Sequence, residues 1–166
     1  PAQMTQFESS IVLADQLSRI YVERGGGGNY YESYTLAWYL AATKTSIDCF
    51  EKRGKKGYIF TVGDERITPT LRAAHIEHFI GVKPQSDLQA DALLMMVSQM
   101  YHVFHIMIAQ GNHMQYDREE VIASWTKFLG QRAMVCEDHT KIGEIITSAI
   151  EITEGRDKDS VISSWT

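Results

Sequence analysis

The sequence predicts an α/β fold: a three-layer, mostly parallel sheet with helices on both faces. The run from Tyr58 to Val62, bounded by glycines, is short, apolar and rich in β-branched and aromatic residues, which is typical of a strand buried on both faces. Residues 101–108 and 132–136 form two further runs of this kind. Segments with helical spacing separate the three runs, so crossover connections should place the strands in parallel, side by side or nearly so.

The helices are expected in a regular order around these strands. A first helix is predicted from Gln6 to about Glu23, with Thr5 as its N-cap, and a second from the cap Asn29 to about Arg53. Asp87 is predicted to cap a long helix that ends at Gln99. Further helices are expected over residues 71–80, 117–128 and 141–152, and residues 110–112 are expected to form a loop.

Length and composition predict one globular domain over residues 1–153, followed by a polar tail over residues 154–166 that could dock through Val161, Ile162 and Trp165. The hydrophobic share is 44%, and the net charge of −5 argues against nucleic acid as a partner. No stretch reaches the roughly 18 apolar residues of a membrane span, and we expect a cytoplasmic protein. Cys49 and Cys136 are predicted to be reduced, buried thiols.

Two features mark a candidate site. Asp64 and Glu65 directly follow the first predicted strand, and the crevice beyond the carboxyl ends of parallel strands is where ligands bind in open α/β sheets. Four glycines at residues 25–28, Gly27 and Gly28 among them, lead into a helix start and could form an anion or ligand cradle; alternatively they are a flexible linker. Tyr30, Tyr31 and Tyr34 either form a rim for protein recognition or pack in the core.

The histidines offer weaker candidates. His75 and His78 lie three residues apart on a predicted short helix, a spacing that could bind Zn²⁺ but more often marks a half-exposed helix face. His102 and His105 lie three apart on a predicted strand, so their side chains point to opposite faces and cannot share a metal. No nucleophile lies at the spacing of a known catalytic motif.

Four segments together resemble a von Willebrand factor A (VWA) domain of the intracellular bacterial and phage branch: GGGGNYYESYTLAWYLA (25–41), KKGYIFTVGDE (55–65), YHVFHIMI (101–108) and RAMVCEDHTKIGEII (132–146). The resemblance implies a metal-ion-dependent adhesion site at the carboxyl edge of the sheet. Asp64 matches the aspartate after the family's fourth strand, and Asn29 falls where the family has a threonine. The family's Asp-x-Ser-x-Ser motif is absent from the chain.

The resemblance also implies strands before the glycine-rich turn, where this sequence has only a helix. A central strand cannot be dropped without exposing rows of unpaired backbone groups. We therefore expect the chain to be a partial fold that lacks the N-terminal strands. The alternative is a reduced fold whose open edge is covered by a second copy, so a homo-oligomer is compatible with the sequence.

The expected function is that of a non-enzymatic module that binds a partner protein at the carboxyl edge, with or without a metal. Mg²⁺ is the ion that carboxylate and amide oxygens would select, and Asp64 and Asn29 are expected to approach each other there. Two protein oxygens are too few to hold Mg²⁺ tightly. The alternative is an enzyme of the phosphoryl-transfer or hydrolase type that uses Asp64 and the glycine-rich turn.

Overall fold

The central element is a sheet of three parallel strands. The computed structural model describes residues 2–21 and 31–164, and its sheet has the order β2 (Gly57–Gly63), β6 (Tyr101–Ile108), β7 (Ala133–Cys136). β2 and β6 pair with Phe60 opposite Phe104, and β6 and β7 pair with Ile106 opposite Met134. The predicted α/β fold and its three parallel strands are therefore confirmed.

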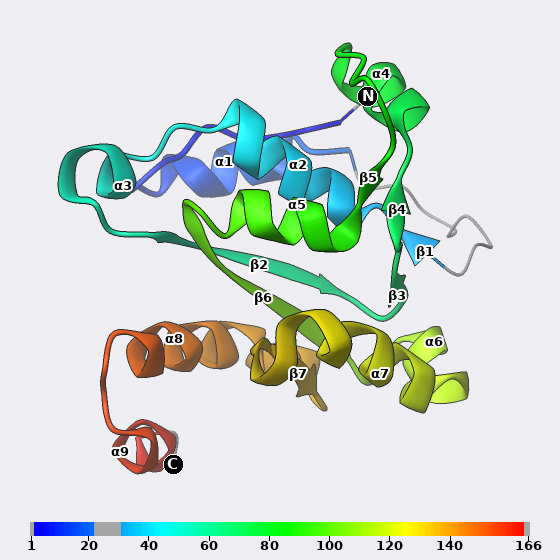
Figure 1. Ribbon diagram of the computed structural model, residues 1–166. Coiled ribbons are helices and arrows are strands. Elements are labelled where there is room, and N and C mark those ends of the chain that lie inside the picture. The colour runs from blue at the N-terminus through cyan, green and yellow to red at the C-terminus, as the bar shows by residue number, and fades with distance from the viewer. Residues whose placement is uncertain (1, 22–30, 165–166) are drawn as a thin grey trace.

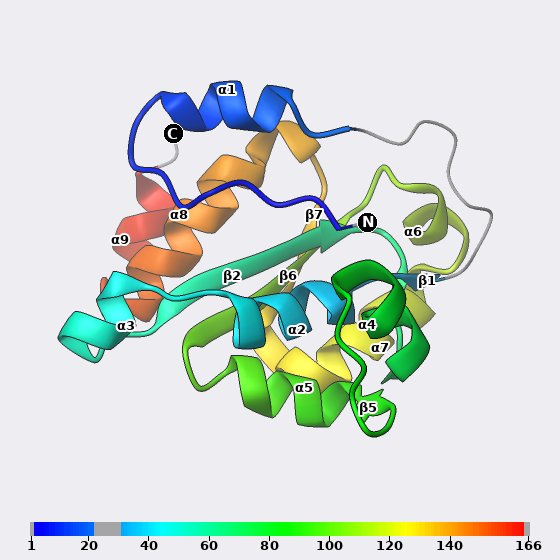
Figure 2. The same cartoon turned by 90° about the horizontal axis from the view of Figure 1, so that it is seen from above.

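Helices cover both faces of this sheet (Figures 1 and 2). One face carries α2 (Tyr34–Lys44), α5 (Ala90–Val97) and α7 (Arg118–Leu129), and α8 (Ile142–Thr153) lies on the other (Figure 2). A hydrogen bond links the sheet to the second face, because the Tyr58 hydroxyl of β2 donates to the Glu154 carboxylate just after α8 at 2.6 Å. The molecule is a three-layer helix–sheet–helix sandwich.

The core lies mainly between the sheet and α2, α5 and α7. Its fully buried side chains include Trp38, Trp125 and Leu93 from these helices, Met107 from the central strand, and Ile76 and Met114 from shorter helices. β6 is buried along almost its whole length because it has a strand on each side and helices on each face. This pattern explains why its sequence is an apolar run without alternation.

Shorter elements complete the fold. Two small pairs lie at the carboxyl end of β2: β1 (Tyr31–Glu32) is parallel to β3 (Arg66–Ile67), and β4 (Thr70–Leu71) is antiparallel to β5 (Leu88–Gln89). The remaining helices are α1 (Val12–Ser18), α3 (Asp48–Arg53), α4 (Ala73–Ile80), α6 (Asn112–Tyr116), α9 (Lys158–Ser163) and the 3-10 turns Gly130–Arg132 and His139–Lys141.

The prediction of one helix from Asn29 to Arg53 is wrong. Asn29 lies outside the described residues, residues 31–32 form a strand, and the helix breaks at residues 45–47 into α2 and α3. At the break, the Thr45 hydroxyl lies 2.6 Å from both the Ala41 carbonyl oxygen and the Tyr101 hydroxyl. The extended backbone there lets Ile47 enter the core, so a tertiary contact overrides helical periodicity.

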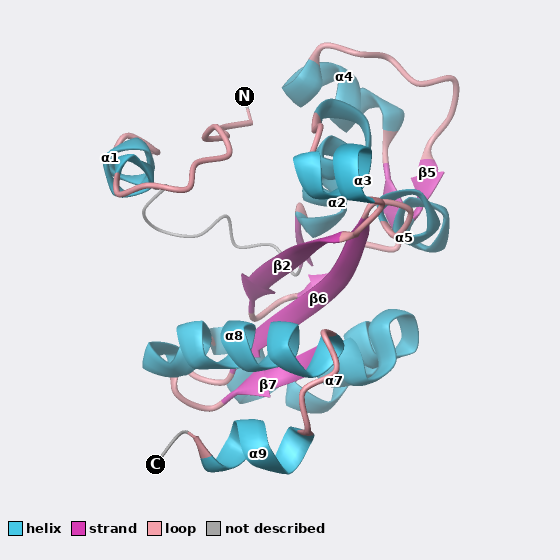
Figure 3. Cartoon of the chain, turned by 90° about the vertical axis from the view of Figure 1, so that its left-hand side faces the viewer, coloured by secondary structure: helices cyan, strands magenta, loops and turns pink. Residues whose placement is uncertain are grey.

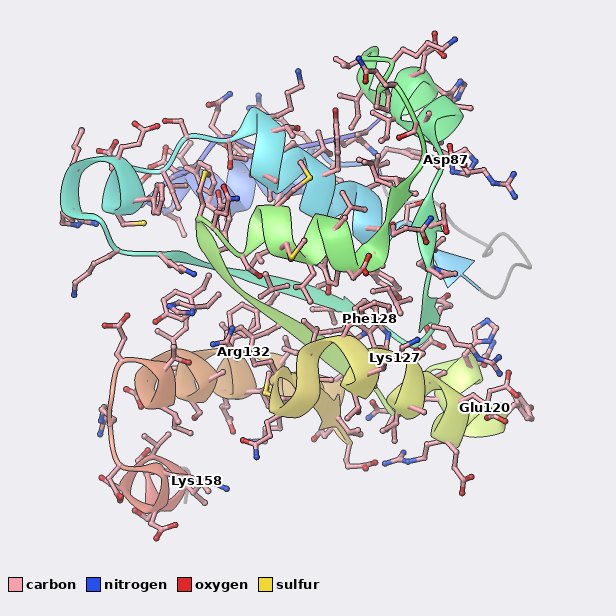
Figure 4. The ribbon with its side chains drawn as sticks, viewed as in Figure 1. Asp87, Glu120, Lys127, Phe128, Arg132 and Lys158 are labelled. Carbon is pink, nitrogen blue, oxygen red and sulfur yellow. The ribbon has the colours of Figure 1, made fainter. Side chains whose placement is uncertain are left out.

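The predicted role of Asp87 is also wrong. Asp87 does not cap the following helix, α5, which begins later at Ala90; its side chain accepts a hydrogen bond from the Ala73 amide at the start of α4, at 2.8 Å. Figure 4 marks Asp87 beside the base of α4. The antiparallel β4–β5 pair places Leu88 opposite Leu71, which brings Asp87 to a helix that begins fourteen residues earlier.

Three other boundaries differ from the predictions. The first helix is limited to α1, because the Glu8 carboxylate accepts hydrogen bonds from the Ser9 and Ser10 amides and closes a local turn before it. Residue 112 begins the short helix α6 instead of ending a loop. The tail contains α9, in which Val161 is buried and Ile162 is exposed, while Trp165 lies outside the described residues.

Two expectations about the chemistry of the chain can be compared with the structure. Both cysteines are free thiols, as predicted; Cys136 is also buried, but the prediction of burial is wrong for Cys49, which is half-buried. In the part of the chain that the structure describes, no helix combines the length and the apolar character needed to cross a membrane.

Candidate binding site at the carboxyl edge of the sheet

The candidate site is built where β2 ends. After Gly63 the chain turns through Asp64 and Glu65 into β3, and β3 pairs in parallel with β1. This pairing places Glu32 opposite Ile67, and the Thr68 hydroxyl donates to the Glu32 carbonyl oxygen at 3.1 Å. A segment from before α2 is thereby held next to the end of β2, and three carboxylates gather at the carboxyl edge of the sheet.

Glu65 is fixed by two donors from the helices that cover the sheet. The Tyr34 hydroxyl, at the start of α2, donates to the Glu65 carboxylate at 2.7 Å, and the Trp125 indole N–H of α7 donates to the Glu65 carbonyl oxygen at 2.9 Å. Gly63 makes the first bond possible, because a Cβ at this position would overlap the Tyr34 hydroxyl. Burial, followed by the hydrogen bond to Glu65, raises the pKa of Tyr34 far above its ordinary value, so the hydroxyl keeps its proton.

Asp64 is held by the loop after β6. Its carboxylate accepts a hydrogen bond from the His113 amide of α6 at 3.0 Å. Gly111 lies so close to Asp64 that any side chain there would collide with the carboxylate. The two neighbouring carboxyl ends, of β2 and β6, therefore define the position of Asp64 together, as expected for the crevice of an open α/β sheet.

The site carries more negative than positive charge. Burial, followed by the negative charges of Glu65 and Asp64, raises the pKa of Glu32 above its ordinary value. The adjacent cation, Arg66, lies 3.6 Å from the Asp117 carboxylate, to which it pairs. The three carboxylates therefore repel one another, and a positive group placed among them would relieve that repulsion.

A buried aromatic cluster lies beneath the carboxylates. His105 stacks on Trp125 with ring centroids 3.5 Å apart, Tyr34 meets both rings edge-on, and His105 Nδ1 lies 2.8 Å from the Thr61 hydroxyl. Burial lowers the pKa of His105 to about 3, so the ring is neutral at ordinary pH. Its Nε2 atom has no hydrogen-bond partner among the described residues.

This Thr61–His105 pair has the composition of a nucleophile and a base, but its placement does not suit catalysis. His105 is fully buried and Thr61 almost so, and Tyr34 and Trp125 enclose the imidazole ring. A substrate has no path to the hydroxyl, and the stacked ring cannot turn toward the carboxyl edge. The pair acts as a packed polar layer that supports the site above it.

The predicted site residues fall into three sets. Asp64 and Glu65 lie together at the carboxyl edge, where the sequence placed them. Gly27, Gly28, Asn29 and Tyr30 lie outside the described residues, so the expected approach of Asn29 to Asp64 stays a prediction. Tyr34, for which recognition and packing were both open, is buried with its hydroxyl on Glu65.

Sequence reasoning missed Glu32, and the signal that could have found it is weak. The predicted helix from Asn29 to Arg53 included Glu32, so the sequence did not connect Glu32 with the site. In the structure, Glu32 belongs to β1, which pairs with the segment that follows Glu65. Strands of two residues carry too few positions to show a period of two. The only signal in the sequence is that Glu32 is an acidic residue between Tyr31 and Tyr34.

The described residues do not fit a magnesium site. Within residues 2–21 and 31–164, no group of three or more His, Cys, Asp or Glu side chains is placed to hold a metal ion. Asp64 and Glu65 each already accept a hydrogen bond from the protein. Mg²⁺ loses its water ligands reluctantly and needs near-octahedral oxygen ligands, which these two side chains do not supply.

Comparison with known proteins adds no relative. No protein-family model, no curated protein and no solved structure matches the chain. The fold class and the local geometry therefore carry the functional interpretation.

Proposed function

We propose that this chain is a non-enzymatic protein-binding module of the VWA type that receives a partner at the carboxyl edge of its sheet. The observation that supports the proposal is the group of three carboxylates, Glu32, Asp64 and Glu65, at one edge of the sheet, where burial, followed by the negative charges of Glu65 and Asp64, raises the pKa of Glu32. A recognition site with unbalanced negative charge is complementary to a positive group on a partner.

The chemistry of the site favours a lysine or arginine side chain of the partner as that group. Asp64 and Glu65 are oriented by donors from the protein, so a partner would meet carboxylates that are already in place. A guanidinium could bind one carboxylate with two parallel hydrogen bonds. Direct contact of this kind would take the role that a metal ion has in the family this chain resembles.

The alternative of a phosphoryl-transfer or hydrolase-type enzyme has less support. It needs the glycine-rich turn, which lies outside the described residues, and a base that can reach a substrate. The Thr61–His105 pair is buried, and the site carboxylates would repel a phosphate.

The experiment is affinity capture with the immobilised full chain, in EDTA and in Mg²⁺, followed by affinity measurement for each retained protein. Asp64→Asn keeps the size of the side chain and removes its charge, and Asp91→Asn removes an exposed charge from α5 as the matched control. We expect a partner whose binding in EDTA weakens at least ten-fold, about 1.4 kcal/mol, in Asp64→Asn and is unchanged in Asp91→Asn.

Two results would contradict the proposal. If every retained protein binds Asp64→Asn as well as the wild type, the carboxyl edge is not the binding surface. If binding occurs only with Mg²⁺, direct contact between the carboxylates and a basic side chain is wrong and the metal-bridged mode is correct.

A further inference from the structure

Within the described residues, one edge of β2 pairs with no other strand. Its other edge pairs with β6 over all seven residues, and no strand in the described part of the chain pairs with the free edge. Gly57 donates its amide to Met100 before β6, so the alternate residues 57, 59, 61 and 63 direct their backbone groups toward β6. Tyr58, Phe60 and Val62 therefore direct their N–H and C=O groups outward, where no described backbone group bonds to them.

The charges at the two ends of β2 are opposite. Arg53, Lys55 and Lys56 precede the strand, and Asp64 and Glu65 follow it. An antiparallel neighbour with the same sequence would bring each basic end beside an acidic end. A parallel neighbour with the same sequence would instead bring like charges together.

From these two features we infer that the free edge of β2 pairs with β2 of a second copy of this chain, antiparallel and centred on Phe60. In this register Phe60 lies opposite itself and Tyr58 lies opposite Val62, so all three outward-facing residues fall in hydrogen-bonded pairs and exchange roughly six backbone hydrogen bonds. The same register sets Lys56 opposite Asp64 of the second copy. The contact is isologous and joins the two sheets into one of six strands.

The side chains along this edge suit such pairing. Tyr58, Phe60 and Val62 share the face of β2 toward α8, and Val62 remains 41% exposed. In the dimer, the Tyr58 and Phe60 rings would meet Val62 and Phe60 of the second copy on one face, and such aromatic and β-branched cross-strand pairs are stabilising. Among the described residues, the edge carries neither a proline nor a bulge that would prevent pairing.

One segment must move for this contact to form. Residues 3–7 line a cavity of about 570 Å³ together with Tyr58 and Ile59, and Figure 3 shows α1, which follows this stretch, farther out from the sheet. The hydrogen bonds that the structure gives residues 2–21 with other described residues all close within that segment. Phe7 remains 70% exposed, so the segment is weakly attached and can be displaced.

The test is sedimentation equilibrium of the full 18.8 kDa chain over a wide concentration range, with amide hydrogen exchange measured at both extremes. We expect a reversible dimer that weakens at high salt, because its charged ends are exposed. The amides of Tyr58, Phe60 and Val62 should exchange more slowly as the concentration rises, while those of Ile59 and Thr61, already bonded to β6, should not change.

Two variants assign the contact to this edge. Val62→Pro removes an outward-facing N–H donor, keeps the hydrogen bonds to β6, and should raise the dissociation constant of the dimer at least ten-fold. Val62→Ala keeps the donor, so its dissociation constant should stay within a few-fold of the wild-type value. Lys56→Glu, on an exposed side chain, should weaken it without any change to the backbone. A single 18.8 kDa species at every concentration would overturn the inference, and so would a dimer that both Val62→Pro and Lys56→Glu leave unchanged.

Discussion

At the scale of single residues, the site depends on two glycines that neighbouring side chains approach too closely for any larger residue to fit. Gly63 admits the Tyr34 hydroxyl and Gly111 admits the Asp64 carboxylate. The sequence indicated Asp64 and Glu65 because acidic residues follow an apolar run. It could not indicate that these glycines are contact positions, because the residues that approach them come from α2 and from the β2 terminus, distant in sequence.

Gly63→Ala tests the closer of these contacts. The new methyl group would displace the Tyr34 ring and break its bond to Glu65, so we expect a destabilisation of about 1–3 kcal/mol, as found for overpacked sites. The matched control is Gly143→Ala in α8, where a Cβ meets nothing within 4 Å. That control should be neutral or stabilising by about 0.5–1 kcal/mol, since glycine is unfavourable in a helix. Chemical denaturation of both variants measures the difference; equal stabilities would contradict the account.

His105 should make the protein sensitive to acid. Its pKa is about 3 in the folded state because of burial, against about 6.5 in an unfolded chain. The unfolded state therefore binds an extra proton between these values, and the free energy of unfolding falls as the pH falls from about 6.5 toward 3, by up to about 1.4 kcal/mol per pH unit.

His105→Phe keeps an aromatic ring on Trp125 and removes the titrating group. We expect the free energy of unfolding to fall less steeply between pH 6.5 and 4 in this variant than in the wild type. Urea denaturation at a series of pH values checks it. Parallel pH profiles for the two proteins would mean that His105 does not titrate on unfolding.

At the scale of elements, the long strands were predictable and the short ones were not. β2, β6 and β7 are apolar runs that periodicity detects, and their parallel direction follows from crossover connections, whereas their order is known from the structure. β1, β3, β4 and β5 have two residues each, and long-range pairing alone defines them. The break between α2 and α3 likewise depends on the Tyr101 hydroxyl near Thr45, a contact that no local pattern reveals.

Asp87→Ala tests the capping contact that the sequence misassigned. The change removes the acceptor for the Ala73 amide, so we expect a loss of about 0.5–2 kcal/mol and faster hydrogen exchange in the first turn of α4. Asp87→Asn keeps an acceptor and should lose less than half as much. Faster exchange at the start of α5 and not of α4 would restore the assignment made from sequence.

At the scale of the whole molecule, the carboxyl end of β2 and its free edge meet at Asp64, which belongs to the acidic site and lies opposite Lys56 of the second copy in the proposed dimer. The carboxyl end of β2 carries the acidic site, and its free edge carries unpaired backbone groups and opposite terminal charges. The sequence predicted the acidic end of this strand. It did not predict that Glu32 would join the site, because that depends on β1 lying beside β3.

The burial of Glu32, together with the nearby negative charges, should also affect the stability of the molecule. Because the pKa of Glu32 is raised in the folded state, the stability that this group contributes is present below the ordinary glutamate value and is lost as the pH rises through the raised pKa. Ionised Glu32 thus opposes folding at neutral pH, and a positive group bound in the proposed site would reduce this effect.

The most direct test of the acidic site is a pH titration of the Glu32 side-chain carboxyl carbon by NMR, in the wild type and in Glu65→Gln. The account predicts a midpoint above the ordinary glutamate value of about 4.3 in the wild type, and a lower midpoint when Glu65 is neutral. A wild-type midpoint at or below the ordinary value, unmoved by Glu65→Gln, would show that the carboxylates do not repel one another and would remove the basis for a site that receives a positive group.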